Sequence, residues 1–358
     1  MANRWLATLT ILCALVLCTS GCGKKKEVSD GRVTWQQVRD ASVTRKNPKT
    51  GVTWTIVGIR TDAADRSRAK QNAEDALATH PDMAGMVGLW AYNPPLILQA
   101  VEARDMADQV KIVGFDEDPR TLQAIEDGKI VGTVVQNPYE FGFRSVEYLA
   151  AQIRGEQVDV PDDELMFVPT RVIRRDTVAD FSNQIAQIRS FQGPTPDYDA
   201  DKYDTSETVS IHFVTNVDDP FWKLAESGCK LAGEKFNADV VLYIPPTGAV
   251  SEQKTHVESM IVNNVDGLAI SVKDPNGQTA DINKWAKEMK VITVDSDAPD
   301  SDRLFYIGTD NVAAGRKAGE LLAEACPEGG KVMIFVGDLS QANANERAQG
   351  VIDALFGQ

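Results

Sequence analysis

The chain is poor in cysteine and histidine, and basic residues are in the minority. Its 358 residues include five cysteines and three histidines, and 52 Asp and Glu outnumber 37 Lys and Arg, giving a formal net charge of −15. Nucleic-acid binding needs basic stripes along the phosphate backbone, so nucleic acid is not expected as a partner. No Cys and His spacing indicates a metal site, and we expect neither a metal nor another cofactor.

The first twenty-two residues are typical of an export signal. Arg4 precedes an apolar run over residues 6–17, which is short for a bilayer span, and small residues stand at 19–21 before Cys22. The sequence TSGC at 19–22 resembles a bacterial lipobox, which implies that the Cys22 thiol carries lipid and is the only attachment to a membrane. An ordinary signal peptide or an uncleaved anchor is the alternative. Residues 23–50 read as a polar tether.

Cys229 and Cys326 are the cysteines left in the body of the chain. Both lie in apolar helical patterns, which favours buried free thiols over a disulfide.

Short apolar strands alternate with amphipathic helices through the rest of the chain. This pattern predicts an α/β fold of doubly wound parallel sheets covered on both faces. About 336 residues after the signal are enough for two domains. The expected strands are Thr53–Gly58, Gly85–Leu89, Val110–Phe115, Ile130–Val135, Val209–Val214, Val240–Ile244, Gly267–Val272, Val291–Asp295 and Lys331–Val336. The expected helices are Ala63–Thr79, Pro94–Arg104, Arg120–Glu126, Phe141–Arg154, Pro220–Phe236, Ser251–Asn263, Thr279–Lys287, Val312–Ala325 and Asn343–Leu355.

Residues 190–207 lack an apolar period and are rich in Pro, Gly and Asp, so they are expected to form a solvated linker. The sequence also stops at 356–358 directly after a helix, where an α/β unit ordinarily continues into a strand. The strand expected at 53–58, near the other end of the chain, supplies such a continuation.

Several segments carry a family resemblance. They are TNVDDPFW at 215–222, VITVDSDAP at 291–299, YIGTDN at 306–311, NANERAQG at 343–350, IVGFDEDP at 112–119 and GTVVQNP at 132–138. Together they resemble the ligand loops and lobe crossings of the ribose-binding-type (type I) periplasmic binding proteins. Their order becomes that of the family if residue 358 is joined to about residue 51. The resemblance therefore implies two lobes joined by a hinge in a circularly permuted chain.

This order assigns parts of the chain to parts of the family fold. Residues 51–189 correspond to the family's C-terminal half, 208–305 to the first lobe and 306–358 to the start of the second lobe.

The resemblance implies capture of a monosaccharide or related polyol between the lobes, and the residue types suit that ligand. Sugars offer C–H faces to aromatic rings and hydroxyls to charged or amide groups. The candidate ligand-binding residues are Asp219, Phe221, Trp222, Asp295, Asp297, Arg347, Asn93, Asp116 and Gln136.

Each candidate also has a structural interpretation. Phe221 and Trp222 are compatible with core packing, Asp219 and Asn93 with helix caps, and Arg347 with a surface position. Asp116 and Asp295 end strands, where they either meet ligand or cap the next segment. Gln136 lies at the return crossing between the lobes, where a role in the hinge and a role in ligand binding are both open.

Departures from the ribose pattern weaken the expectation of a pentose. Ser296 follows Asp295 where ribose-selective members tend to carry Arg, and Ala64 lies where the family has a further aromatic residue. Hexoses, pentoses and other polyols all remain open.

The family implies closure of the lobes on the sugar and recognition of the closed form by an ABC permease in the periplasm or cell envelope. A receptor module feeding a membrane sensor is the alternative. Transcriptional repressors share the lobe architecture, but the export signal argues against them. An enzyme is not expected, because no nucleophile elbow, phosphate-binding Gly-rich loop or metal motif is present. We expect a monomer, with exchange of halves between two chains as the alternative.

Overall fold

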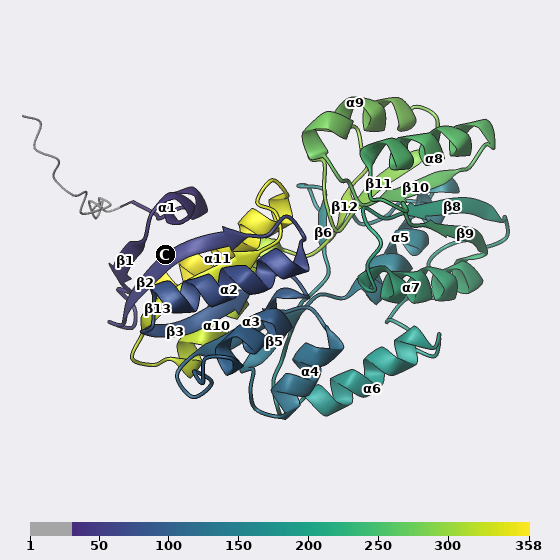
Figure 1. Cartoon of the computed structure of the whole chain (residues 1–358). Coiled ribbons are helices and arrows are strands. Elements are labelled where there is room, and N and C mark those ends of the chain that lie inside the picture. The colour runs from purple at the N-terminus through teal and green to yellow at the C-terminus, as the bar shows by residue number, and fades with distance from the viewer. Residues whose placement is uncertain (1–30) are drawn as a thin grey trace, which may run out of the picture.

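The computed structural model describes residues 31–358, which form two α/β lobes side by side (Figure 1). The predicted export signal, the predicted lipidation site at Cys22 and the first part of the predicted tether fall on residues 1–30, outside the described residues. In the described part, no helix is both long and apolar enough to cross a bilayer.

The first lobe contains a six-stranded sheet with the order β6-β12-β11-β10-β8-β9, and every neighbouring pair is parallel. The strands are β6 (Leu165–Phe167), β8 (Val209–Val214), β9 (Ala238–Tyr243), β10 (Gly267–Ile270), β11 (Lys290–Val294) and β12 (Tyr306–Gly308). Successive strand residues point to opposite faces, so continuous apolar runs bury both faces. One face packs on α5 (Pro138–Ile153) and α7 (Phe221–Phe236), and the other on α8 (Val250–Val262) and α9 (Pro275–Trp285).

The second lobe contains a seven-stranded sheet with the order β1-β2-β13-β3-β4-β5-β7. Its strands are β1 (Val43–Lys46), β2 (Thr53–Thr61), β3 (Met83–Gly88), β4 (Lys111–Phe115), β5 (Gly132–Val135), β7 (Arg171–Ile173) and β13 (Gly330–Val336). The inner pairs are parallel, whereas β1 with β2 and β5 with β7 are antiparallel. One face packs on α1 (Trp35–Asp40), α10 (Asn311–Ala325) and α11 (Ala342–Phe356). The other packs on α2 (Arg66–Thr79), α3 (Asn93–Glu102), α4 (Pro119–Glu126) and α6 (Val178–Arg189).

The predicted class of two parallel-sheet lobes is therefore confirmed, and the chain crosses between the lobes at three places. These crossings are β12 to α10, β5 to α5 and β6 to β7. They lie side by side in the middle of the molecule (Figure 1), where they form the hinge. Cys229 and Cys326 are buried free thiols, as predicted.

The polar tether predicted at 23–50 is wrong for its described part. Val33, Val38 and Val43 are buried in the core of the second lobe, and β1 pairs antiparallel with β2. The three valines are separated by charged and polar residues, so their pattern is too short to stand out in the sequence. The segment adds an edge strand and a short helix to the lobe.

The linker at 190–207 contains no helix or strand, but it is not simply solvated. The Tyr198 ring packs edge-on against Phe143 and Phe236, with ring centroids 5.6 and 5.4 Å apart, and Tyr203 is buried. The ring contacts of Tyr198 hold the linker against α5 and α7.

Candidate functional site

A cavity of about 310 Å³ lies between the lobes. It is lined by the loops that follow β2, β3, β4, β5 and β13 of the second lobe and β8, β10 and β11 of the first. The carboxyl ends of parallel strands face each other there, which is where open α/β sheets bind ligands. The volume lies in the range of small-molecule sites.

Asp116 and Asp295 occupy matching positions on opposite walls of the cavity. Each directly follows a strand, β4 or β11, and each has left-handed backbone, with φ of 62° and 63°. Both side chains are buried. Gln136 Nε2 donates to Asp116 Oδ1 at 3.0 Å, and Ser271 Oγ donates to Asp295 Oδ2 at 3.1 Å. These single bonds fix each carboxylate and leave further acceptor capacity for a ligand.

Arg347 lies on α11 between these aspartates and is almost fully buried. Its Nε donates to Asn311 Oδ1 at 2.9 Å, its Nη1 donates to the Leu89 carbonyl at 3.2 Å, and its guanidinium covers the Phe115 ring at 4.1 Å. The surface position considered for Arg347 is therefore wrong. A fixed guanidinium at this point is suited to donating hydrogen bonds to ligand oxygens.

Aromatic side chains line both walls. Phe221 is half-buried on the first lobe, and its ring meets Trp222 edge-on at a centroid distance of 4.9 Å. Trp222 reaches the cavity but is only 1% exposed and belongs to the lobe core, so its packing role is its main contribution. On the second lobe, Trp90 and Tyr92 line the cavity with their rings 6.1 Å apart.

Asp219 and Gln136 also line the cavity, and each has a second role. Asp219 Oδ1 accepts from the Phe221 amide at 2.9 Å at the start of α7. Gln136 Oε1 accepts from Thr309 Oγ1 at 2.9 Å. Because Gln136 follows β5 and Thr309 follows β12, this bond ties two hinge crossings together and, through Asp116, connects them to the cavity.

Asn93 does not line the cavity. Its Nδ2 donates to Asp62 Oδ2 at 3.1 Å, and its Oδ1 accepts from the Trp90 amide at 3.0 Å. Both ends of the amide are used inside the second lobe, so the ligand role predicted for Asn93 is replaced by positioning of the loop that carries Trp90 and Tyr92. The Tyr92 hydroxyl donates to the same Asp62.

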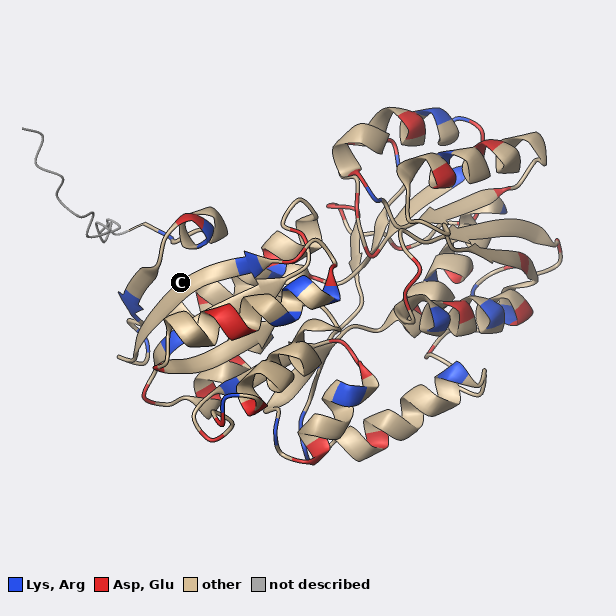
Figure 2. Ribbon diagram, viewed as in Figure 1, with Lys and Arg blue, Asp and Glu red and all other residues tan. Residues whose placement is uncertain are grey.

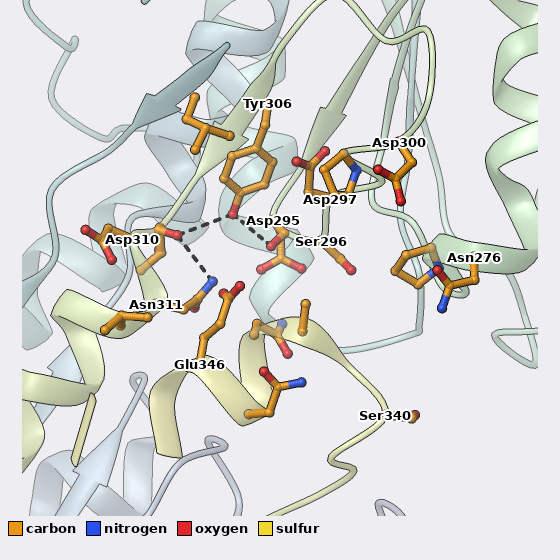
Figure 3. A pocket seen from close by; sticks show the side chains of 18 of the residues that line it. Asn276, Asp295, Ser296, Asp297, Asp300, Tyr306, Asp310, Asn311, Ser340 and Glu346 are labelled. Atoms are coloured by element: carbon orange, nitrogen blue, oxygen red, sulfur yellow. Dashed lines mark hydrogen bonds between the residues drawn. The ribbon is translucent and has the colours of Figure 1, made fainter. Parts of the chain in front are cut away.

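Asp297 does not line this cavity but a second hollow of about 680 Å³, which also lies between the lobes and shares Asp295 with the cavity (Figure 3). Arg303 donates to its carboxylate through Nε and Nη2, at 2.6 and 2.9 Å. Thr293 Oγ1 and the Ala298 amide also donate to it. An aspartate bound this completely within its own lobe has little acceptor capacity left, and the ligand role predicted for it is not supported.

Sequence reasoning missed Trp90, Tyr92, Glu117 and Arg66 among the residues that line the cavity. A signal was present, because Trp90 and Tyr92 directly follow a predicted strand at its carboxyl end, and Glu117 is next to Asp116.

Acidic groups dominate the cavity, and Figure 2 shows Asp and Glu on several loops between the lobes. Burial raises the pKa of Asp116 and Asp219 above their usual range, and it raises the pKa of Asp295 to about 6. The nearby charge of Arg347 opposes the shift of Asp116 and Asp295. In the part of the chain described here, no group of three or more Cys, His, Asp or Glu is arranged to hold a metal ion.

The arrangement combines aromatic faces from both lobes with buried carboxylates, amides and one guanidinium. Such a set can bind a small polyhydroxylated ligand by packing on its C–H faces and hydrogen bonding at its edges.

Comparison with known proteins gives matches in two separate parts of the chain. The periplasmic binding protein domain family matches residues 38–157 and 211–357. The ribose import binding protein of Salmonella typhimurium is 32% identical over 96 residues, which cover 26% of this chain and 31% of the relative. The ribose import binding protein of Haemophilus influenzae is 25% identical over 153 residues, which cover 42% of this chain and 51% of the relative.

Among solved structures, an ABC transporter solute-binding protein from Burkholderia graminis, in complex with D-arabinose, matches with a TM-score of 0.40 and 33% identity. That match covers 42% of this chain and 53% of the other chain. The chain thus spans between about a third and a half of the length of the curated relatives it matches.

Proposed function

This chain belongs to the periplasmic binding protein domain family, and we propose that it captures a monosaccharide or related polyol in the cavity between its lobes. In this proposal the ligand-bound, closed form is presented to an ABC permease. The protein acts outside the cytoplasm, attached to a membrane through lipid on Cys22, and it is a binding protein and not an enzyme.

One observation carries the proposal: each lobe contributes an aromatic face and a buried aspartate to the same cavity. Phe221 and Asp295 come from the first lobe, and Trp90, Tyr92 and Asp116 from the second. A sugar ring between two aromatic walls buries both of its C–H faces. Charge-assisted hydrogen bonds contribute about 1.5–3 kcal/mol each, so a few of them reach micromolar affinity after ordering costs.

The relatives' names support a sugar and a transport role, since both curated relatives are ribose import binding proteins. The ligand need not be ribose. Ser296 follows Asp295, and Ala64 lines the cavity where the ribose pattern has an aromatic ring. Trp90 and Tyr92 supply aromatic faces on the second-lobe wall, which suit a hexose as well as a pentose.

Binding and lobe closure are coupled in this proposal because the ligand contacts both lobes. A ligand that bridges Asp116 and Asp295 stabilises the closed form by its differential affinity for that form. Hydrogen bonds from Thr309 to Gln136 and from Gln136 to Asp116 connect the hinge directly to a carboxylate of the cavity wall.

We also propose that the chain is a circular permutant of its family, and the strand order supports this. If the strands of the first sheet are numbered along the chain from residue 208, β8 is the first strand and β9 the second. Their order across the sheet, β9-β8-β10-β11-β12, is then second, first, third, fourth, fifth. Read from β13 through residue 358 and on to β2, the second sheet has the same order, as β2-β13-β3-β4-β5. This is a common order of doubly wound sheets.

The two ends of the proposed junction are adjacent in space. Asn47 Nδ2 donates to the carbonyls of Ala354 and Leu355 at 3.3 and 3.1 Å, and Gln358 Nε2 donates to the Val33 carbonyl at 2.8 Å. A chain with residue 358 joined to residue 51 and new ends opened within 190–207 should bind the same sugar with similar affinity. Loss of binding by such a chain, if it is folded by circular dichroism, would argue against the permutation.

The function is tested by titrating the purified protein with aldoses and polyols while following tryptophan fluorescence, since Trp90 lines the cavity. We expect a saturable response to one or a few sugars, weakened at least tenfold by Asp116→Ala or Asp295→Ala. The control is Asp162→Ala, which changes an exposed aspartate before β6. Parent-like binding by both cavity variants would refute the assignment of the cleft.

A further inference from the structure

Glu117 is a buried carboxyl group in the cavity wall, and one of its oxygens has no hydrogen-bond partner. Its side chain is only 6% exposed, it lines the cavity in the loop after β4, and its Oε2 lies in the interior without a hydrogen-bond partner. The Glu117 carboxyl forms no ion pair with any described residue, and the hydrogen bond that acts on it comes from its own backbone amide. A buried carboxyl oxygen without a partner is costly, so its retention needs an explanation.

The groups around Glu117 do not neutralise it. Asp116 precedes it on the same loop, and Asp219 faces it from the first lobe before α7. Arg189 at the end of α6 and Arg171 on β7 are the cations that act on it, but only at a distance. Burial and the neighbouring Asp116 raise the pKa of Glu117 to about 8, so the carboxyl holds a proton in the empty cavity at neutral pH.

The fully buried part of the cavity wall contains more acids than bases. Asp116, Glu117 and Asp295 face a single buried guanidinium, that of Arg347, which already donates to Asn311 and Leu89. A ligand composed of hydroxyls alone satisfies Asp116 and Asp295 as hydrogen-bond acceptors and leaves Glu117 neutral. A ligand that also carries a positive charge at this wall can form a charge-assisted hydrogen bond with Glu117, so that Asp116, Asp295 and Glu117 all have a partner.

We propose that the preferred ligand is a monosaccharide or polyol that carries a primary amine, with its ammonium group placed against Glu117. This inference rests on the proposed sugar-binding function and specifies its ligand class. The cavity of about 310 Å³ is suited to a single sugar unit. An ammonium needs only one free carboxylate, and Glu117 supplies it.

Isothermal titration calorimetry with glucosamine, galactosamine and mannosamine, each beside its parent hexose and its N-acetyl derivative, tests the inference. We expect one amino sugar to bind at least about tenfold more tightly than both uncharged forms. Glu117→Gln keeps the shape of the side chain and should remove this preference for the amino sugar over its parent hexose.

The matched control is Asp118→Asn, one residue away. It also removes a negative charge from the lining, but the Asp118 carboxylate is already paired with Arg120 at 2.7 Å. The preference for the amino sugar should survive in this variant. Loss of the preference in both variants would indicate a general field effect and would overturn the specific role of Glu117.

Proton release gives a second readout that does not depend on stability. At about pH 6.5, an ammonium ligand that ionises Glu117 should release about one proton per site, seen as a dependence of binding heat on buffer ionisation enthalpy. Glu117→Gln should release none. Equal affinity for the hexose and the amino sugar, without proton release, would overturn this inference and leave the proposed sugar-binding function standing. Absence of binding by every sugar to the folded protein would refute the proposed function itself.

Discussion

Asp116 and Asp295 show how single residues prepare the cavity before a ligand arrives. Each carboxylate is removed from water, is held by one neighbouring side chain, and sits on left-handed backbone that is uncommon for a residue other than glycine. Burial and strain of this kind cost stability in the free protein. The cost is offset when a ligand donates hydrogen bonds to the carboxylates.

The pH dependence of stability tests this at Asp295. Burial raises its pKa to about 6 from an ordinary value of 3.8, so the folded state binds the proton more tightly than the unfolded state. This group therefore favours folding below about pH 4, and its contribution is lost as the pH rises to about 6. Asp295→Asn should increase the free energy of unfolding at pH 7 by about 1–3 kcal/mol and flatten its dependence between pH 4 and 6.

Urea unfolding of the ligand-free protein and of Asp295→Asn at about pH 4.5 and 7 measures this effect. Asp162→Asn serves as an exposed control that should change neither quantity. A destabilised Asp295→Asn at pH 7 would show that the carboxylate is stabilising in the free protein and would contradict the account.

Substitution of Trp90 and of Trp222 should distinguish a role in ligand binding from a role in core packing. Trp222 is 1% exposed within the first-lobe core, so Trp222→Ala should cost about 3–5 kcal/mol of stability. Trp90 is half-buried at the cavity wall, so Trp90→Ala should cost less stability and weaken sugar binding about tenfold or more. Unfolding curves and titrations of both variants decide this, and unchanged affinity of Trp90→Ala would exclude its ring from the ligand wall.

Seven of the nine candidates named from the family resemblance and their residue types line the cavity, but the sequence did not show the tertiary partners that redirect the other two. Asn93 and Asp297 had the right chemistry in the right loops, yet Asp62 and Arg303 bind them inside their own lobes. A contact outside the cavity was also not predictable, because its two residues are far apart in the sequence: His212 Nδ1 and His256 Nε2 lie 3.0 Å apart.

At the scale of elements, most long periodic segments were predictable and several short ones were not. The predicted helix at Pro220–Phe236 begins one residue before the observed α7. The short elements β1, β6, β7, β12 and α1 were missed, and so was the 12-residue helix α6. Three-residue strands such as β6 and β7 carry almost no periodic signal, and their pairing depends on partners elsewhere in the chain.

Helix pairs in both lobes approach closely at glycines. In the second lobe, a Cβ added at Gly350 on α11 would lie 2.1 Å from the Val312 carbonyl oxygen of α10. Gly350→Ala should separate the two helices, lower the free energy of unfolding by about 2–4 kcal/mol and displace Arg347 one turn away on the same helix.

Sugar titration and denaturant unfolding together check this expectation. Gly155→Ala is a useful comparison, because a Cβ there meets no atom within 4 Å and its cost arises from the φ of +80° alone. Gly155→Ala should lose stability without losing affinity. A Gly350→Ala protein with parent-like affinity would show that α11 does not control the position of Arg347.

The whole molecule combines distant parts of the chain in one lobe. The sheet of the second lobe places β13, near residue 330, between β2 and β3. The alternation of strands and helices predicted two such sheets, but alternation alone cannot specify which strands are neighbours. The family resemblance carries tertiary information that periodicity lacks, and it gave the expectation that residues 306–358 share a lobe with most of residues 51–189.

Packing of the linker favours closure of this arrangement within a single chain. Arg144 Nη2 donates to the Asp197 carbonyl at 2.6 Å, and Asn237 Nδ2 donates to the Thr205 carbonyl at 2.9 Å, so the linker follows a defined path over the first lobe. We expect the mass of a monomer at every concentration from about 1 to 100 μM by light scattering coupled to size exclusion. A dimer that persists on dilution would indicate exchange of halves between chains.

The central claim is that one ligand contacts both lobes, and hydrogen–deuterium exchange with and without saturating sugar tests it most directly. We predict slower exchange in the loops at 89–92 and 116–119 of the second lobe and in those at 216–221 and 295–296 of the first, with the outer helices α8 and α9 unchanged. Slower exchange confined to the loops of one lobe would contradict the account.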